Sequence, residues 1–266
     1  MELEDVIVKH LVGRSSFEGD IIPYYELFFY QGKEEYVENV VSYISAHAGD
    51  VENKNVIDVG CGTGIFAEAL AKRGANVLAV DISKDMIGYA QQNHSDRSIE
   101  YQVLDICNSP IDRKGDLAIA LSHVVGYQLQ NDRLRKFLCN ISNSLKMGGI
   151  FAFNFYNESA ILSKNLVPQF RQVHAEGITI TRISNVVTHQ IKNILQMKYR
   201  YLIEREKEEL IDIYIEEGMR YYSLMELDNC LHSAGFKIKT ACNFLTENNL
   251  SWDEWNGFIV AEKVNN

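Results

Sequence analysis

Apolar residues recur with two different spacings along this chain, and the spacing changes near residue 157. Before that point, short apolar runs alternate with segments whose apolar residues follow the helical period. The runs that predict strands are residues 55–60, 76–81, 99–105, 116–121 and 150–155. Because strands that alternate with helices join through right-handed crossovers, we expect a doubly wound, mostly parallel α/β sheet with helices on both faces.

After residue 157, β-branched and aromatic residues dominate three runs, at 178–187, 194–203 and 210–222. The polar segments THQIKN and EREKEE separate these runs. The pattern predicts three antiparallel strands inserted into the α/β arrangement, with EREKEE (204–209) as an exposed hairpin turn.

The helical pattern then resumes at SLMELDNCLHSAG, where Ser223 is a predicted N-cap and Gly235 a predicted C-cap. The runs FKIKTAC and GFIVAEK follow and bring the main sheet to seven predicted strands. Earlier in the chain, LKMGG (145–149) is predicted to end the long helix before it, with glycine beyond the helix C-terminus.

These patterns divide the chain into four segments. We expect an N-terminal helical lid (1–52), an α/β core (53–157), an inserted antiparallel β-sheet (158–222) and a completion of the core (223–266). The inserted sheet would either roof a substrate site or form the surface of a homodimer.

Charge and cysteine usage exclude several classes of protein. The chain has 36 acidic and 26 basic side chains and a formal net charge of −10, which disfavours nucleic acid as a partner. Its five cysteines are widely spaced and form no C-x-x-C, so we expect neither a disulfide framework nor a zinc site. No run has the length of a membrane span, and MELEDVIVKH is no signal peptide, so we expect a cytoplasmic protein without a metal.

The segment VIDVGCGTGIF (56–66) carries the first sign of a ligand. A predicted strand ends at three alternate glycines, Gly60, Gly62 and Gly64, and a helix follows. This strand–loop–helix context is typical of nucleotide binding, yet the G-x-G-x-G spacing differs from the G-x-G-x-x-G of dinucleotide sites. The glycine loop alone therefore leaves the ligand open.

Three carboxylates at strand positions narrow the choice. Asp81 ends the second strand, where it can accept hydrogen bonds from both hydroxyls of a ribose, as in NAD sites. Asp58 lies just before the glycines and Asp105 ends the third strand. Carboxylates beside the loop repel a pyrophosphate and attract an amino group or a sulfonium, so an NAD oxidoreductase is the weakest alternative.

The segments VIDVGCGTG, VLAVDISKDMIGYA, YQVLDI and LKMGGIFAF, in this order, make residues 53–157 resemble a class I S-adenosylmethionine-dependent methyltransferase. The resemblance implies a Rossmann-like core with S-adenosylmethionine as cofactor. It also implies that the methionine amino group is held through Asp58 and the ribose by Asp81. The remaining residues that it assigns to the cofactor are Gly60, Gly62, Gly64, Ile82, Met86, Asp105, Ile106 and Ser122, with Ile82, Met86, Asp105 and Ile106 around the adenine.

A second resemblance spans nearly the whole chain. YELFFYQGKEEY (25–36), the SHVVGY loop, the inserted strands and the closing helix are similar to TDP-amino-sugar N,N-dimethyltransferases. It implies that Tyr25 closes over the cofactor and that Tyr127 lies near the acceptor amine. The chain departs from that family by carrying His123 in place of a small polar residue, and by ending its fifth strand in NFYN.

The loop after the fourth strand, SHVVGYQLQND, is where this fold faces the transferable methyl group. It offers His123 as a residue that could orient an amine or act as a base, and Tyr127 beside it. The inserted strands add four basic residues that could hold a diphosphate or could form a solvated face: Arg182, Lys198, Arg200 and Arg220.

The sequence thus predicts a methyltransferase that acts on a small-molecule acceptor, with an amine of a sugar nucleotide or secondary metabolite slightly ahead of a hydroxyl. Methylation of tRNA or another macromolecule is an alternative, which the net charge of −10 disfavours. A non-catalytic binding module that keeps the cofactor is another.

Overall fold

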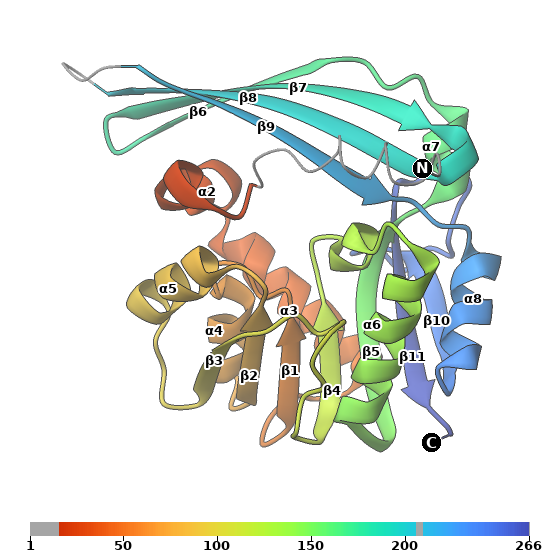
Figure 1. Ribbon diagram of the computed structural model, residues 1–266. Helices are drawn as coiled ribbons and strands as arrows, with labels where there is room; N and C mark the ends of the chain where they lie inside the picture. Colours follow the sequence, from red (N-terminus) through yellow and green to blue (C-terminus); the bar gives the residue numbers. More distant parts are fainter. Residues whose placement is uncertain (1–15, 206–209, 266) are drawn as a thin grey trace.

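The computed structural model describes residues 16–205 and 210–265, which form a seven-stranded sheet and a separate four-stranded sheet that lies across the carboxyl ends of its parallel strands (Figure 1). In sheet order, the seven strands are β10 (Phe236–Asn243), β11 (Asn256–Lys263), β5 (Leu145–Tyr156), β4 (Gly115–Ala120), β1 (Asn55–Val59), β2 (Asn76–Asp81) and β3 (Ile99–Val103). Only β11 runs antiparallel to its neighbours β5 and β10. The predicted doubly wound, mostly parallel seven-stranded fold is confirmed.

Helices cover both faces of this sheet because successive residues of a buried strand point to opposite sides. Val56 of β1 packs in a cluster with Val40 and Leu70, whereas the next residue, Ile57, packs with Phe137 and Leu227 on the other face. The helices of the first face are α3 (Glu34–Ala48), α4 (Ile65–Lys72) and α5 (Lys84–Asn93). Those of the second face are α6 (Asn131–Ser144) and α8 (Leu224–Ser233).

The inserted sheet has four antiparallel strands, one more than the sequence predicts. They are β6 (Gln169–Ala175), β7 (Ile178–His189), β8 (Ile194–Arg205) and β9 (Ile211–Arg220), and the short helix α7 (Glu158–Ser163) leads into them. The prediction missed β6 because this edge strand, QFRQVHA, is mostly exposed and carries few apolar residues. Of the predicted hairpin turn at 204–209, residues 206–209 lie outside the described residues.

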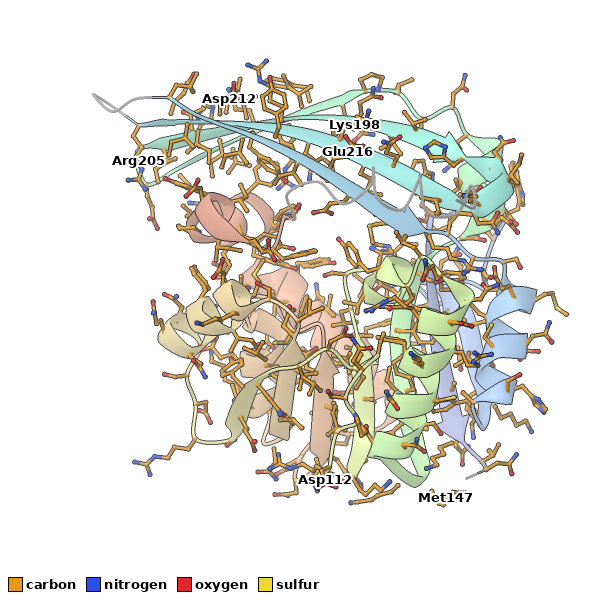
Figure 2. The ribbon with its side chains drawn as sticks, viewed as in Figure 1. Asp112, Met147, Lys198, Arg205, Asp212 and Glu216 are labelled. Carbon is orange, nitrogen blue, oxygen red and sulfur yellow. The ribbon has the colours of Figure 1, made fainter. Side chains whose placement is uncertain are left out.

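The N-terminal helix α2 (Ile22–Phe29), with a 3₁₀ turn before it (η1, Gly19–Ile21), lies between the inserted sheet and the core (Figure 1). Tyr24 and Phe28 of α2 share a buried cluster with Tyr201 of β8 and Met86 of α5. The helix is therefore the packed layer that joins the two sheets. Figure 2 shows the opposite ends of the molecule, with Asp212 on the inserted sheet and Asp112 and Met147 at the far edge of the core.

Local signals at helix ends are partly confirmed. The Ser223 side chain accepts a hydrogen bond from the Glu226 amide at 3.2 Å, as an N-cap does, and Gly235 adopts a φ of 84° just after α8. The prediction for LKMGG was wrong: α6 ends at Ser144, and Leu145 already begins β5. Leu145 pairs with Gly115 of β4 across an irregular register, so tertiary strand pairing recruits this segment.

Candidate active site

A cavity of about 570 Å³ lies at the carboxyl ends of β1, β2 and β4. Ligands in open α/β sheets bind at these ends, where the strand order reverses, and here the reversal lies between β1 and β4. The glycine loop (60–63) and the three carboxylates Asp58, Asp81 and Asp105 line the cavity. The structure thus brings together most of the residues that the sequence predicted to hold the cofactor.

The three glycines of the loop have different structural roles. Gly60 has a φ of 70°, and a Cβ there would meet a methyl group of Val124 at 2.5 Å. Gly62 has a φ of 55°, and a Cβ there would meet no protein atom within 4 Å, so its backbone faces open space in the cavity. Gly64 does not line the cavity: its φ is 87°, and a Cβ would meet the Tyr101 hydroxyl at 2.5 Å, so it allows α4 to start against β3.

Asp58 is a buried carboxylate with an unused acceptor. Its side chain is 2% exposed, and its Oδ2 atom has no hydrogen-bond partner in the structure. Burial, together with the nearby charge of Asp81, raises the pKa of Asp58 to about 7. A buried carboxylate without a donor is costly on its own, so the position fits an amino group of a ligand.

Asp81 organises the loop as well as facing the cavity. Its two oxygens accept hydrogen bonds from the amides of Gly62 at 2.9 Å and Ser83 at 2.8 Å. Burial raises the pKa of Asp81, while these amide donors oppose the shift. Because each carboxylate oxygen has a second lone pair, Asp81 can still accept the hydroxyls of a ribose.

The far end of the cavity carries the residues predicted around an adenine, with one exception. Asp105, Ile106 and Ile82 line it, and Asp105 also pairs with Arg133 at 3.2 Å. Met86 does not line the cavity, because it is fully buried in the cluster beneath α2. The structure therefore does not bring Met86 to the lining where the adenine is expected, unlike the other three residues.

A second cavity of about 360 Å³ lies under the inserted sheet and adjoins the first. Both cavities are lined by Phe17, Tyr25, Tyr30, Phe66, Leu121, Ser122, Tyr127 and Glu217. The predicted residues Tyr25, Ser122 and Tyr127 thus lie at the boundary between a nucleotide-sized space and a roofed space beside it. Tyr25 reaches this boundary from α2, where its ring packs against Phe29 with centroids 4.6 Å apart.

The loop after β4 is held in a strained conformation. Ser122 and His123 have φ values of 55° and 62°, a left-handed conformation that costs about 1–3 kcal/mol for such residues. The His123 amide donates to the Asn154 side chain at 3.0 Å, and its ring stacks on Tyr156 with centroids 3.9 Å apart. These contacts fix the imidazole at the wall of the second cavity.

Burial lowers the pKa of His123 to about 4, although a hydrogen bond with Asn256 opposes the shift. The imidazole is therefore neutral at pH 7. Its buried Nε2 atom has no hydrogen-bond partner in the structure. His123 can accept a hydrogen bond from a ligand, but it is a weak base.

Glu217 is a site residue that the sequence reasoning missed. Its carboxylate is 7% exposed, accepts a hydrogen bond from the Tyr127 hydroxyl at 3.1 Å and another from the Ser16 amide at 2.6 Å. A signal was present: in IDIYIEEGM, the alternation of Ile213, Ile215 and Met219 places Glu217 on the same inward face. A charged residue at an inward position of a strand is an anomaly that indicates a site.

Of the four basic residues predicted on the insertion, Arg182 alone lines either of these two cavities. Lys198 and Arg200 pair with Glu216 at 3.9 Å and Asp212 at 2.7 Å. Arg220 pairs with Glu226 of α8 and with Asn131 at the start of α6, so it joins the insertion to the core.

Two further features bear on the class of protein. Within residues 16–205 and 210–265, no three His, Cys, Asp or Glu side chains are grouped so that they could hold a metal ion. None of the helices in this described part combines the length and apolar character needed to cross a membrane.

Residues 56–149 match a family described as a methyltransferase domain. Over 112 residues, the chain is 33% identical to a malonyl-[acyl-carrier protein] O-methyltransferase of Acetivibrio thermocellus; the match covers 40% of this chain and 38% of that protein. The chain therefore spans about two fifths of the length of this curated relative.

Two solved structures share the fold over nearly the whole chain. DesVI of Streptomyces venezuelae superposes with a TM-score of 0.77 at 18% identity, covering 92% of this chain and 99% of that one. CalS10 of Micromonospora echinaspora, an amino pentose methyltransferase with S-adenosylmethionine bound, superposes with a TM-score of 0.69 at 17% identity, covering 99% and 98%. The inserted sheet and the N-terminal helix thus belong to a shared architecture.

Proposed function

We propose that this chain, which carries a methyltransferase domain and has the fold of S-adenosylmethionine-dependent methyltransferases, methylates a small-molecule amine. The larger cavity would hold the cofactor and the roofed cavity the acceptor. Their shared boundary, lined by Tyr25, Ser122, Tyr127 and Glu217, would be the place of methyl transfer.

The residues of the larger cavity suit this cofactor. The unpartnered Oδ2 of Asp58 would accept a hydrogen bond from the methionine ammonium group, and Asp81 would accept from the ribose hydroxyls. Asp105, Ile82 and Ile106 would surround the adenine. Gly60 and Gly62 would let the backbone approach the ligand closely.

When bound, the cofactor supplies an electrophilic methyl group on a sulfonium. What the protein must supply is an acceptor nitrogen aligned with that methyl group. Orientation of this kind can lower a barrier by about 7–11 kcal/mol. The stacked His123 ring and the hydrogen-bonded pair Tyr127 and Glu217 are held in place by their contacts and would provide this orientation.

Glu217 is the single observation that carries the preference for an amine. A buried carboxylate at the boundary of the two cavities attracts an ammonium and accepts hydrogen bonds from a neutral amine. The unpartnered Nε2 of His123 can accept a second N–H. The proton released on methylation would pass to Glu217 or to water, so no strong base is needed.

A hydroxyl acceptor is the second candidate, because the relative with 33% identity is an O-methyltransferase. Deprotonating a hydroxyl requires a competent base, and a histidine whose pKa is about 4 is poorly suited to that task. Within the amine class, an amino sugar nucleotide or a similar secondary metabolite remains our preferred acceptor, in line with the likeness of fold to an amino pentose methyltransferase.

Isothermal titration with S-adenosylhomocysteine, followed by TDP and TDP-amino sugars added to the saturated protein, tests this proposal. We expect micromolar binding of the cofactor product and turnover of an amine in the presence of S-adenosylmethionine. Cofactor binding without any nucleotide binding would rule out a sugar nucleotide as the acceptor but would remain consistent with a methyltransferase. A lack of cofactor binding would refute the assignment of the glycine loop to the cofactor, and with it the proposed function.

We further propose a cytoplasmic enzyme, which five free cysteines support. The outer face of the inserted sheet exposes Phe170, Ile183 and Tyr214, which supports a homodimer formed through this sheet. Sedimentation of the wild type and of a Tyr214→Lys variant tests the dimer: a monomer in the wild type would refute it.

A further inference from the structure

Arg182 of β7 is a cation placed inside the roofed cavity. The strand register puts it on the inward face of the inserted sheet, and its guanidinium lies over the rings of Phe28 at 5.0 Å and Tyr199 at 5.2 Å. The other arginines and lysines that were predicted on this sheet face outward or pair with carboxylates at its edge.

The charge of Arg182 is not neutralised. Among residues 16–205 and 210–265, no carboxylate forms an ion pair with it, and its buried Nε atom has no hydrogen-bond partner. The guanidinium does hydrogen-bond the hydroxyl of Tyr201, its neighbour on β8. A buried donor left without an acceptor is unfavourable, so the position requires an explanation.

A like charge lies directly beside Arg182. Arg171 of β6 is its direct register partner, and like charges in opposed positions of a sheet destabilise it. Burial and the charge of Arg182 lower the pKa of Arg171, and burial and the charge of Arg171 lower that of Lys33. Arg182 and Lys33 both line the roofed cavity, with Arg171 beside them, in a protein whose formal net charge is −10.

Two of these cations have a structural role that explains them. Arg171 donates to the carbonyl oxygen of Phe28 at 2.8 Å, and Lys33 donates to that of Phe29 at 2.8 Å. Both bonds satisfy free carbonyl groups at the C-terminus of α2, where positive charge is also favourable. Arg182 makes no such bond, so helix capping does not account for it.

We propose that Arg182 is a specificity-determining residue that binds an anionic group, a carboxylate or a phosphate, on the acceptor. This inference rests on the proposed methyl transfer in the same cavity. An anion would supply the missing acceptor to the guanidinium and relieve the repulsion between Arg182 and Arg171.

The same geometry sets the length of the acceptor. Arg182 and Glu217 point inward from strands β7 and β9, which are separated by β8, and the register displaces them by four residues along the strands. From strand spacing and rise, their Cα atoms are about 16 Å apart, and the two side chains extend into the space between. The acceptor would therefore carry its amine and its anionic group at opposite ends of a body several ångströms long.

Thermal unfolding of the S-adenosylhomocysteine-saturated protein tests the inference with inorganic phosphate, pyrophosphate and acetate at constant ionic strength. We expect at least one anion to raise the Tm in a saturable manner, and phosphate against acetate distinguishes the two chemical classes. Arg182→Met keeps the apolar stem of the side chain and should lower the affinity for the anion at least tenfold. Arg182→Lys should keep part of the stabilisation by the anion. Arg200→Met, on the outward face of the same sheet, is the matched control and should behave as the wild type.

Binding of S-adenosylhomocysteine must be equal in all four proteins, which shows that the variants are folded and separates this test from that of the proposed function. If no anion stabilises the wild type, or if Arg182→Met responds as the wild type does, the inference is wrong. A loss of cofactor-product binding in the wild type would instead refute the proposed function.

Discussion

The Tyr127 hydroxyl donates a hydrogen bond to the Glu217 carboxylate at 3.1 Å, although 90 positions separate the two residues in the chain. Tyr127 comes from the loop after β4 and Glu217 from the inserted sheet. The second oxygen of Glu217 accepts the amide of Ser16, which precedes the N-terminal helix. One carboxylate thus ties together the three parts of the chain that enclose the junction of the two cavities.

Replacing Glu217 with Gln should raise the KM for an amine acceptor by about 10–100-fold, since a hydrogen bond to a charged group contributes about 1.5–3 kcal/mol. Steady-state kinetics with S-adenosylmethionine would measure it. Glu217→Asp should recover part of the loss. Glu204→Gln, on the exposed end of β8, is the control. An unchanged KM in Glu217→Gln would count against an amine-binding role.

His123→Asn should slow methyl transfer about 2–10-fold, the effect of losing one neutral hydrogen bond, because asparagine also tolerates the left-handed conformation at this position. Because the pKa of His123 is about 4, the imidazole does not titrate between pH 6 and 9. The shape of the pH–rate profile in that range should therefore be the same in both proteins. Loss of an acidic limb in the variant, that is, of a fall in rate towards low pH, would show that His123 acts as a base.

The affinity for S-adenosylhomocysteine should fall as the pH is lowered through about 7. In the free protein, the pKa of Asp58 is raised to about 7 by burial, so below that pH a proton must leave before the carboxylate can pair with the ligand's ammonium group. Titration calorimetry should show a slope of up to tenfold per pH unit. Asp58→Asn should weaken binding at pH 8 and flatten the slope.

The raised pKa of Asp58 also makes the stability of the ligand-free protein depend on pH. A carboxyl group whose pKa is higher in the folded state than in the unfolded chain favours folding only while it is protonated, so its ionisation lowers stability as the pH rises from about 4 to 7. Asp58→Asn should therefore raise the free energy of unfolding at pH 8. A variant less stable than the wild type at pH 8 would contradict the shift.

His94 links the N-terminal helix to the core in a pH-dependent manner. Its two ring nitrogens contact Glu26 of α2 at 2.8 Å and Glu68 of α4 at 3.0 Å, and two ionised carboxylates require a doubly protonated ring. Although burial favours the neutral ring, these carboxylates raise the pKa of His94. Lys72, which pairs with Glu68, and Tyr89, which donates to Glu26, also face the cluster.

Since the folded-state pKa of His94 lies above its usual 6.5, the contribution to stability is fully present below pH 6.5 and is lost as the pH rises through the folded value. Chemical unfolding of the wild type and of His94→Gln should therefore differ most near pH 6, by about 1 kcal/mol, and converge at higher pH. A difference independent of pH would show that the ring acts through packing alone.

Gly60→Ala should abolish measurable binding of S-adenosylhomocysteine and destabilise the fold by about 1–3 kcal/mol. The added methyl group would overlap the Val124 side chain, which is stiff because it is β-branched, and the φ of 70° disfavours alanine. Gly62→Ala shares the positive φ but meets no protein atom, so its free energy of unfolding should fall by only about 1–2 kcal/mol. An equal loss of unfolding free energy in both variants would indicate that the positive φ alone is responsible.

Hydrophobic periodicity was sufficient to predict the central strands and most helices, because buried parallel strands are apolar on both faces and amphipathic helices repeat on one. It failed at β6, an exposed edge strand, and at Leu145, where pairing with β4 extends β5 back to the end of α6. In both places, the conformation depends on a partner strand that the local sequence does not reveal.

The residues proposed to hold the cofactor could be identified from the sequence by itself. Gly60, Gly62, Asp58, Asp81 and Asp105 are specified by strand–loop–helix context, since parallel strands bring their carboxyl ends to one edge. Only the tertiary structure decided the lining of the roofed cavity, the proposed acceptor site, to which Glu217, Arg182 and the neutral His123 come from segments far apart in the chain. Whether such side chains are paired, and in which protonation state, depends on burial and on neighbours that only the packed fold supplies.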